Sequence, residues 1–189
     1  MATHDTDDVV DVVLEDHQRI RELFSEFETA KPDQRTPLWE TIVRTLAVHE
    51  TAEEEIVHPQ VRREVDGGGD IVAARRREED EAKKALARLE KIGPNDPSFE
   101  TEFTAFRHDV LRHAEREEHD ELPQLRASVS VEKRKNLASV FSSAKAMAPT
   151  HAHKAAPESA VGNVIVGPFV AIVDRVRDVI RDAMRKRAS

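Results

Sequence analysis

The sequence predicts an all-α protein, an antiparallel up-and-down four-helix bundle with a C-terminal helical extension. Long segments rich in Ala, Glu, Arg and Leu lie between small groups of turn residues, which is the composition of helices. Val, Ile and Phe never alternate with polar residues over the length of a strand, which argues against a sheet. Four of the segments are long, and the connections between them are short, as antiparallel neighbours in a bundle require.

Capping residues, prolines and glycine predict the boundaries of the four helices. Thr36 and Pro37 form a cap followed by proline and predict the start of the second helix. Gly93-Pro94 ends the third, and Asp96-Pro97 begins the fourth. The expected helices span residues 7–30, 36–66, 70–92 and 96–126. Each carries a stripe of apolar residues at steps of three and four, which predicts one buried face per helix.

The chain divides into a bundle at residues 1–128 and an extension at residues 129–189. The extension is expected to hold a short helix at 131–147, a Pro/Ala/Gly-rich linker at 148–168 and an amphipathic helix from 169 to 184. We expect this last helix to dock on the bundle or on a partner helix. It is therefore the candidate surface for a protein partner or for self-association.

Composition excludes several classes of function. With 29 Lys and Arg against 37 Asp and Glu, the net charge of −8 argues against nucleic acid or an anionic membrane as a partner. There is no Cys, so thiolate metal sites and cysteine nucleophiles are excluded. The N-terminus has no signal-peptide pattern, and the longest apolar stretch, residues 161–173, is too interrupted to span a bilayer. The expectation is a cytoplasmic protein whose metal, if any, is held by His and carboxylates.

Two segments repeat each other at an offset of 64 residues. HETAEEEIVHPQVR is residues 49–62 and HAEREEHDELPQLR is residues 113–126. Each places a His four residues before a Glu, His49 with Glu53 and His113 with Glu117, so that both side chains lie on one helix face. A His and a Glu on an apolar face are costly unless something satisfies them, and a shared metal ion would do so. The alternative is a pair of buried His–Glu hydrogen bonds.

The remaining candidate ligands come from the first three helices. His17 lies on the inner stripe of the first helix, and Glu50 follows His49 and can reach the same interior. The third helix has no His, and its inward candidates are Glu78 and Glu79, of which Glu79 is in step with the apolar stripe. The candidate metal ligands are therefore His17, His49, Glu50, Glu53, Glu79, His113 and Glu117.

The other six histidines are not predicted to be ligands. His58, His108 and His119 are expected on outward faces of their helices, and the rest are expected in the N-terminus and the linker, at His4, His151 and His153.

The donor set predicts the kind of metal. Imidazoles with carboxylates and no thiolate suit iron or manganese and do not exclude zinc. Six or seven ligands converging from four helices are too many for one tetrahedral ion and suit two octahedral ions bridged by Glu53 and Glu117.

On these residues the chain resembles the haemerythrin-like HHE cation-binding proteins, over about residues 8–127. His17, the two His-x-x-x-Glu motifs and a third-helix ligand match the positions that surround a non-haem di-iron centre in that family. Glu50 matches a glutamate that some members use. The tail, with APTHAH and DRVRD, resembles the extension of actinobacterial-type members. The resemblance implies two non-haem iron ions that bind O2, peroxide or NO, and some members disproportionate peroxide.

Two departures from the family pattern narrow the chemistry. Glu79 stands where many members have His, and the absence of Tyr excludes the tyrosine-ligated variants. The predicted function is binding of a small oxidant at a di-iron site, with catalase-like peroxide disproportionation as its enzymatic form. The alternatives are a non-enzymatic sensor of iron or gas that acts through the C-terminal helix, and a metal-free helical adaptor.

Overall fold

The computed structural model describes residues 8–147 and 168–188, so His4, His151, His153 and nearly all of the predicted linker lie outside it. Every element in these ranges is helical, which confirms the predicted fold class. The elements, in which η denotes a π-helix, are α1 (Val9–Glu28), α2 (Pro32–Ala52), η1 (Glu53–Val57), α3 (His58–Glu64), α4 (Gly68–Ile92), α5 (Phe99–Arg116), η2 (Glu117–Glu121), α6 (Leu122–Ser128), α7 (Val131–Met147) and α8 (Pro168–Ala188).

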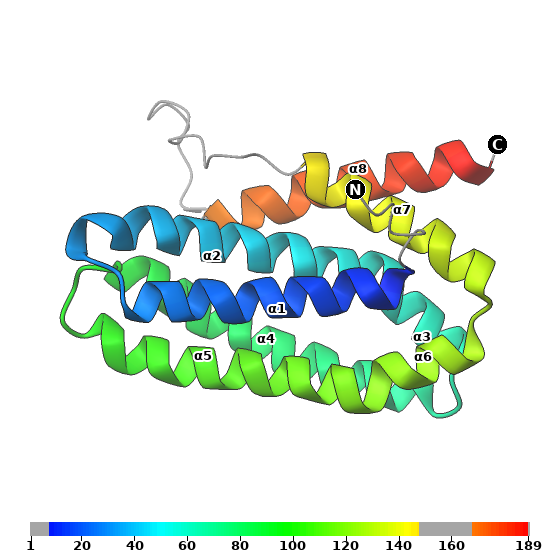
Figure 1. Cartoon of the computed structure of the whole chain (residues 1–189), viewed down its shortest axis with the longest axis horizontal. Helices are drawn as coiled ribbons and strands as arrows, with labels where there is room; N and C mark the ends of the chain where they lie inside the picture. Colours follow the sequence, from blue (N-terminus) through cyan, green and yellow to red (C-terminus); the bar gives the residue numbers. More distant parts are fainter. Residues whose placement is uncertain (1–7, 148–167, 189) are drawn as a thin grey trace, which may run out of the picture.

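Four long rods form the bundle: α1, the continuous path α2–η1–α3, α4, and the path α5–η2–α6 (Figure 1). Short turns join them. At the turn before α4, Gly67 has a φ of +66°, and a Cβ on Gly68 would lie 2.0 Å from the carbonyl oxygen of Val61. Glycine is therefore required for α4 to return this closely against α3.

Two predicted helix starts differ from the structure. The second rod begins at Pro32, not at Thr36, because Lys31 is extended and its N–H donates to the side chain of Gln34. Pro37 consequently lies inside the helix. The fourth rod begins at Phe99, not at Asp96, because the Asp96 carboxylate accepts the N–H of Ser98 and holds a turn there.

Both His-x-x-x-Glu motifs end in a π-helix. The N–H of His58 donates to the carbonyl of Glu53, five residues back, and the N–H of Leu122 donates in the same way to Glu117. Such a wider turn puts one extra residue into the helix and changes the face on which every later side chain lies. The 64-residue repeat is therefore also a repeat of backbone geometry.

The apolar core has two parts, separated by a polar layer. One cluster gathers most of the aromatic side chains, including Phe27 and Phe103 with ring centroids 4.6 Å apart. The other contains aliphatic residues near η1 and η2 together with residues of α7 and α8. The change from one cluster to the other comes at a buried polar residue, which is His17 between Val13 and Ile20 in α1 and Glu79 between Val72 and Leu86 in α4, for example. The helices thus bring their polar residues to the same level of the bundle.

The extension packs on the bundle. In Figure 1, α8 runs along the outer side of α2, beside α7. Ile172, Val176 and Ile180 of α8 are buried in the aliphatic cluster. Arg177 donates to Glu55 at 2.7 Å and to Glu54 at 3.1 Å, which connects α8 to η1.

Candidate metal centre

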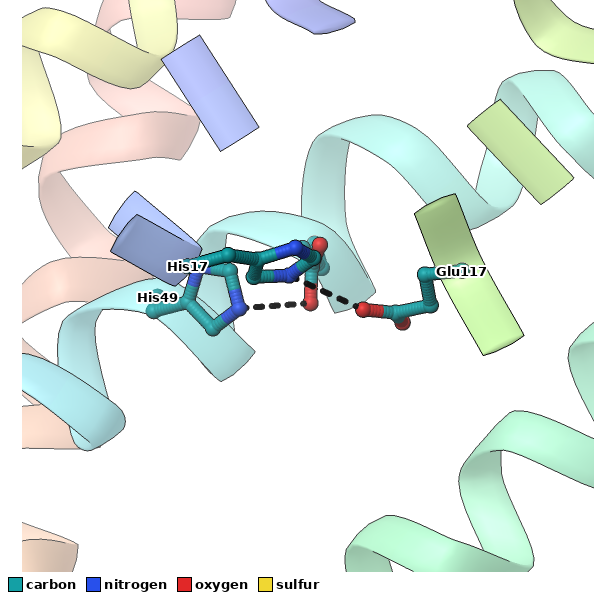
Figure 2. Close-up of side chains that lie close together, drawn as sticks. His17, His49 and Glu117 are labelled. Carbon is teal, nitrogen blue, oxygen red and sulfur yellow. Dashed lines mark ion pairs between the residues drawn. The ribbon is translucent and has the colours of Figure 1, made fainter. Parts of the chain in front are cut away.

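The polar layer brings His17, His49, Glu53 and Glu117 together. One nitrogen or oxygen of each lies within 4.8 Å of those of the others, and all four side chains are buried. In Figure 2, His17 of α1 forms an ion pair with Glu117 of η2, and the ring of His49 of α2 lies beside that of His17; the two ring centroids are 4.9 Å apart and the ring planes lie at 73°. This spacing is close enough for the four side chains to bind one metal ion.

A second buried group lies next to the first. Glu50, Glu79 and His113 also bring their ligand atoms within 4.8 Å of one another. The two groups are adjacent because the Nε2 atom of His113 is 3.1 Å from Glu117 Oε1. All seven candidate ligands from the sequence therefore lie in two neighbouring groups.

The three histidines have the same orientation. Each directs Nε2 toward a carboxylate of the centre, at 3.2 Å for His17 to Glu117 and 3.3 Å for His49 to Glu53. Each directs Nδ1 toward a second carboxylate outside the centre. These outer partners are Glu118 for His17 at 2.9 Å, Glu78 for His113 at 3.0 Å and Asp16 for His49 at 3.7 Å. Metal-bound histidines are oriented by outer carboxylates in this way.

The structure separates Glu78 from Glu79. Glu78 lies at the rim, where Arg75 and Arg116 donate to it along with its contact to His113. Glu79 is buried, and neither of its carboxylate oxygens has a hydrogen bond. Glu79 is thus the third-helix side chain with free donor atoms inside the bundle.

The carboxylates of the centre have unusual proton affinities. Burial, with neighbouring carboxylates adding to it, raises the pKa of Glu79 to about 9 and that of Glu121 to about 8. Burial and the charge of Glu117 raise the pKa of Glu53 well above its ordinary value. Burial opposes ionisation of Glu117 as well, but the imidazoles beside it hold its pKa well below the ordinary value. At neutral pH, Glu79 and Glu121 are therefore protonated in the metal-free protein.

The pKa values of two of the histidines are raised as well. Burial alone would lower the pKa of His113, but Glu117 and Glu78 outweigh it and raise the pKa to about 12. The pKa of His17 is raised in the same way, since Glu117 and Glu118 outweigh its burial. A metal ion that binds here has to displace these protons.

The residues fit a metal ion. Buried nitrogen and oxygen atoms without a hydrogen bond include Nε2 of His17 and of His113, one oxygen each of Glu50, Glu53 and Glu117, and both oxygens of Glu79. Leaving such atoms unsatisfied costs about 1–3 kcal/mol each. They are clustered at one level of the bundle, where cations would satisfy them together.

The predicted position of His58 is wrong. The sequence placed it on an outward face, but it is 3 % exposed, and its Nε2 atom lies 3.5 Å from Glu79 Oε1 and 3.9 Å from Glu121 Oε1. In a continuous α-helix His58 would be turned roughly 180° from His49, at about 100° per residue over nine residues. The π-helix η1 accommodates one extra residue in its turn. His58 is therefore rotated by about 100° less than in a continuous α-helix, and it faces inward. Burial lowers the pKa of His58 to about 4. His108 and His119, by contrast, are exposed as predicted.

Sequence reasoning missed Glu121 altogether. It is 1 % exposed and forms a third buried group with His58 and Glu117. Its signal was present in the sequence, because Glu121 follows Glu117 by four residues just as Glu117 follows His113.

Comparison with known proteins agrees with this geometry. The model of the hemerythrin HHE cation-binding domain matches residues 8–125, which include every residue of the three buried groups. The chain belongs to the hemerythrin HHE cation-binding family. Metal binding is the property for which that domain is named, and the buried His/Glu groups supply the donors for it.

Individual relatives in this family differ in length. The chain is 25% identical over 174 residues to the hemerythrin-like protein C869.06c of Schizosaccharomyces pombe, covering 91% of this chain and 86% of the relative. It is 29% identical over 138 residues to a DNA nickase of Nostoc, covering 72% of this chain but only 39% of the nickase. Among solved structures, the HHE domain protein from Mycobacterium kansasii, an Rv2633c homologue, has a TM-score of 0.64 at 19% identity and covers 72% of this chain and 83% of its own. This structural likeness supports the fold.

None of the helices in the described ranges is both long and apolar enough to cross a membrane.

Proposed function

We propose that the chain is a non-haem di-iron protein that binds a small oxidant, O2, peroxide or NO. The observation that carries the proposal is the pair of adjacent buried groups, one with His17 and His49 and the other with Glu79 and His113, each with donor atoms that lack hydrogen bonds. Three imidazoles and four carboxylates without a thiolate are a donor set for iron or manganese, with zinc less suited to so many ligands.

Different residues of the chain would bind the ions and orient the ligands. Glu53 and Glu117 belong to the first group, and Glu117 also lies 3.1 Å from His113 of the second, so these are the carboxylates that two ions would share, as in other di-iron bundles. The outer carboxylates of Glu118, Glu78 and Asp16 fix the histidine rings. When bound, an iron pair supplies electrons to, or withdraws them from, a small oxidant.

The protein also limits what reaches the centre. A cavity of about 20 Å³ lies beside Glu50 and Glu79 and is otherwise lined mainly by apolar side chains, among them Phe106, Val110 and Phe169. A volume of this size holds a water-sized or diatomic molecule and little more. The aromatic cluster, including Phe24, Phe103 and Phe106, packs the bundle on this side of the centre and excludes bulk water.

The carboxylate-rich donor set favours oxidative chemistry over oxygen carriage. Anionic oxygen ligands stabilise ferric iron, which disfavours reversible release of O2. Disproportionation of peroxide, in which two H2O2 give two H2O and one O2, is the activity we expect. Anaerobically loaded diferrous protein should be mixed with O2 and, separately, with peroxide. Oxygen evolution from peroxide and irreversible oxidation by O2 are expected, and a stable O2-dependent spectrum that reverses under vacuum would contradict the proposal.

A second candidate function is a sensor of iron or gas, and α8 is the observation that favours it. Phe169 of α8 lines the small cavity beside Glu50 and Glu79, and Arg177 pairs with η1 directly after Glu53. Metal or ligand binding at the centre could thus change the docking of α8. Hydrogen exchange over residues 168–188 should differ between the metal-free and iron-loaded protein, and identical exchange would count against this function.

A further inference from the structure

A third group of buried donors lies beside the two proposed iron positions. It consists of His58 of α3, Glu121 of η2 and Glu117, whose ligand atoms lie within 4.8 Å of one another. The family resemblance assigns no role to His58 or Glu121. Both are nonetheless among the most buried polar side chains of the protein, at 3 % and 1 % exposure.

These side chains are directed at each other without hydrogen bonds. Neither ring nitrogen of His58 and neither carboxylate oxygen of Glu121 has a hydrogen-bond partner. The guanidinium of Arg75 has its Nε atom 3.7 Å from Glu121 Oε2, and Arg75 instead donates from Nη1 to Glu78 at 2.7 Å. Four buried donor atoms on two side chains thus lack a partner at one point in the bundle, and a bound ion would supply it.

His58 also lines a pocket of about 330 Å³ between η1, α3, α4 and α8.

We propose that His58 and Glu121, sharing Glu117 with the iron pair, form a third divalent-cation position. One imidazole and two carboxylates suit Fe²⁺, Mn²⁺, Co²⁺ or Zn²⁺. The position fills after the pair, because Glu117 is already shared with the first two ions. The inference rests on the proposed di-iron function only through Glu117.

The number of Co²⁺ ions bound per chain tests the third cation position. Co²⁺ accepts the same ligands as iron and needs no control of its oxidation state. The full-length protein is equilibrated with excess Co²⁺, and bound metal is measured by elemental analysis. The variants are His58→Ala and the nearly isosteric Glu121→Gln, with His119→Ala as the matched control, because His119 is exposed on η2. Circular dichroism establishes that each variant keeps its helix content.

The expected result is three Co²⁺ ions in the wild type and in His119→Ala, and two in each of the other variants. Equal counts in wild type, His58→Ala and Glu121→Gln would overturn the third position and leave the pair intact. A fall below two in these variants would also overturn it, because it would place His58 and Glu121 within the pair. Fewer than two ions in the wild type would contradict the di-iron proposal itself.

Discussion

The two repeated halves of the bundle, residues 49–62 and 113–126, have the same backbone and opposite chemistry. Both contain a His-x-x-x-Glu motif followed by a π-helix, and both bury the last residue of that π-helix and the residue after it. In the first half these residues are Val57 and His58, and in the second they are Glu121 and Leu122. The repeat thus provides two equivalent pairs of buried positions, and each half uses one member of its pair for a polar group. One half supplies an imidazole and the other a carboxylate.

The largest expected effect comes from the histidine that the halves share. His49→Ala or His113→Ala removes a donor that lies within about 3.3 Å of a central glutamate, so iron content should fall from about two ions per chain to less than one. Iron is measured after anaerobic reconstitution. His119→Ala should keep the wild-type content. Equal loss in all three variants would contradict the assignment of faces.

The next largest effect is on the free energy of unfolding, at the equivalent buried positions His58 and Leu122, where the two halves differ. Leu122 is buried in the aliphatic cluster, so Leu122→Ala should lower the free energy of unfolding of the metal-free protein by about 2–5 kcal/mol. His58→Ala should lower it by less, because it also removes two buried nitrogens that have no hydrogen bond. Urea unfolding measures both values. A larger loss for His58→Ala would mean that the imidazole stabilises the apoprotein.

A smaller effect is expected at the glutamates that follow the two motifs. Glu118 orients His17, whereas its equivalent Glu54 accepts from Lys83 and Arg177. Glu118→Gln should weaken iron binding about 10–100-fold, the usual cost of losing an outer carboxylate. Glu54→Gln is the matched control and should leave iron affinity nearly unchanged. Competition with a chelator of known affinity measures both.

The most gradual effect is that of pH on the metal-free protein. The pKa values of His113, Glu79 and Glu121 are raised to about 12, 9 and 8, so the folded apoprotein holds protons that the unfolded chain has lost above pH 6.5. Stability falls with pH wherever the folded state binds more protons.

The melting temperature of the apoprotein should therefore decrease from pH 6.5 to 9, by about 2–4 °C for each kcal/mol lost. Iron affinity should rise over the same range, because binding displaces these protons. Calorimetry at several pH values checks both directions. An apoprotein that became more stable toward pH 9 would contradict the proposed proton-bound state.

How far the sequence predicted this structure depends on helix regularity. The helical period of about 3.6 residues was enough to predict the four rods. It was also enough to predict that His17, His49 and His113 face inward, because these residues lie before the π-helices. It failed at His58, which lies beyond a π turn that no periodic pattern marks, whereas Glu121 was missed although it follows Glu117 by four residues. It also left Glu78 and Glu79 undecided, since adjacent residues on one helix are separated only by what packs against them.

Iron content of the wild-type protein tests the proposed pair without any substitution. After anaerobic loading with Fe²⁺ and removal of excess metal, the protein should retain about two iron ions per chain. Exposure to air should then produce the near-ultraviolet charge-transfer absorbance of a coupled ferric pair. A colourless protein that retains no iron would contradict the proposal and favour the metal-free helical adaptor.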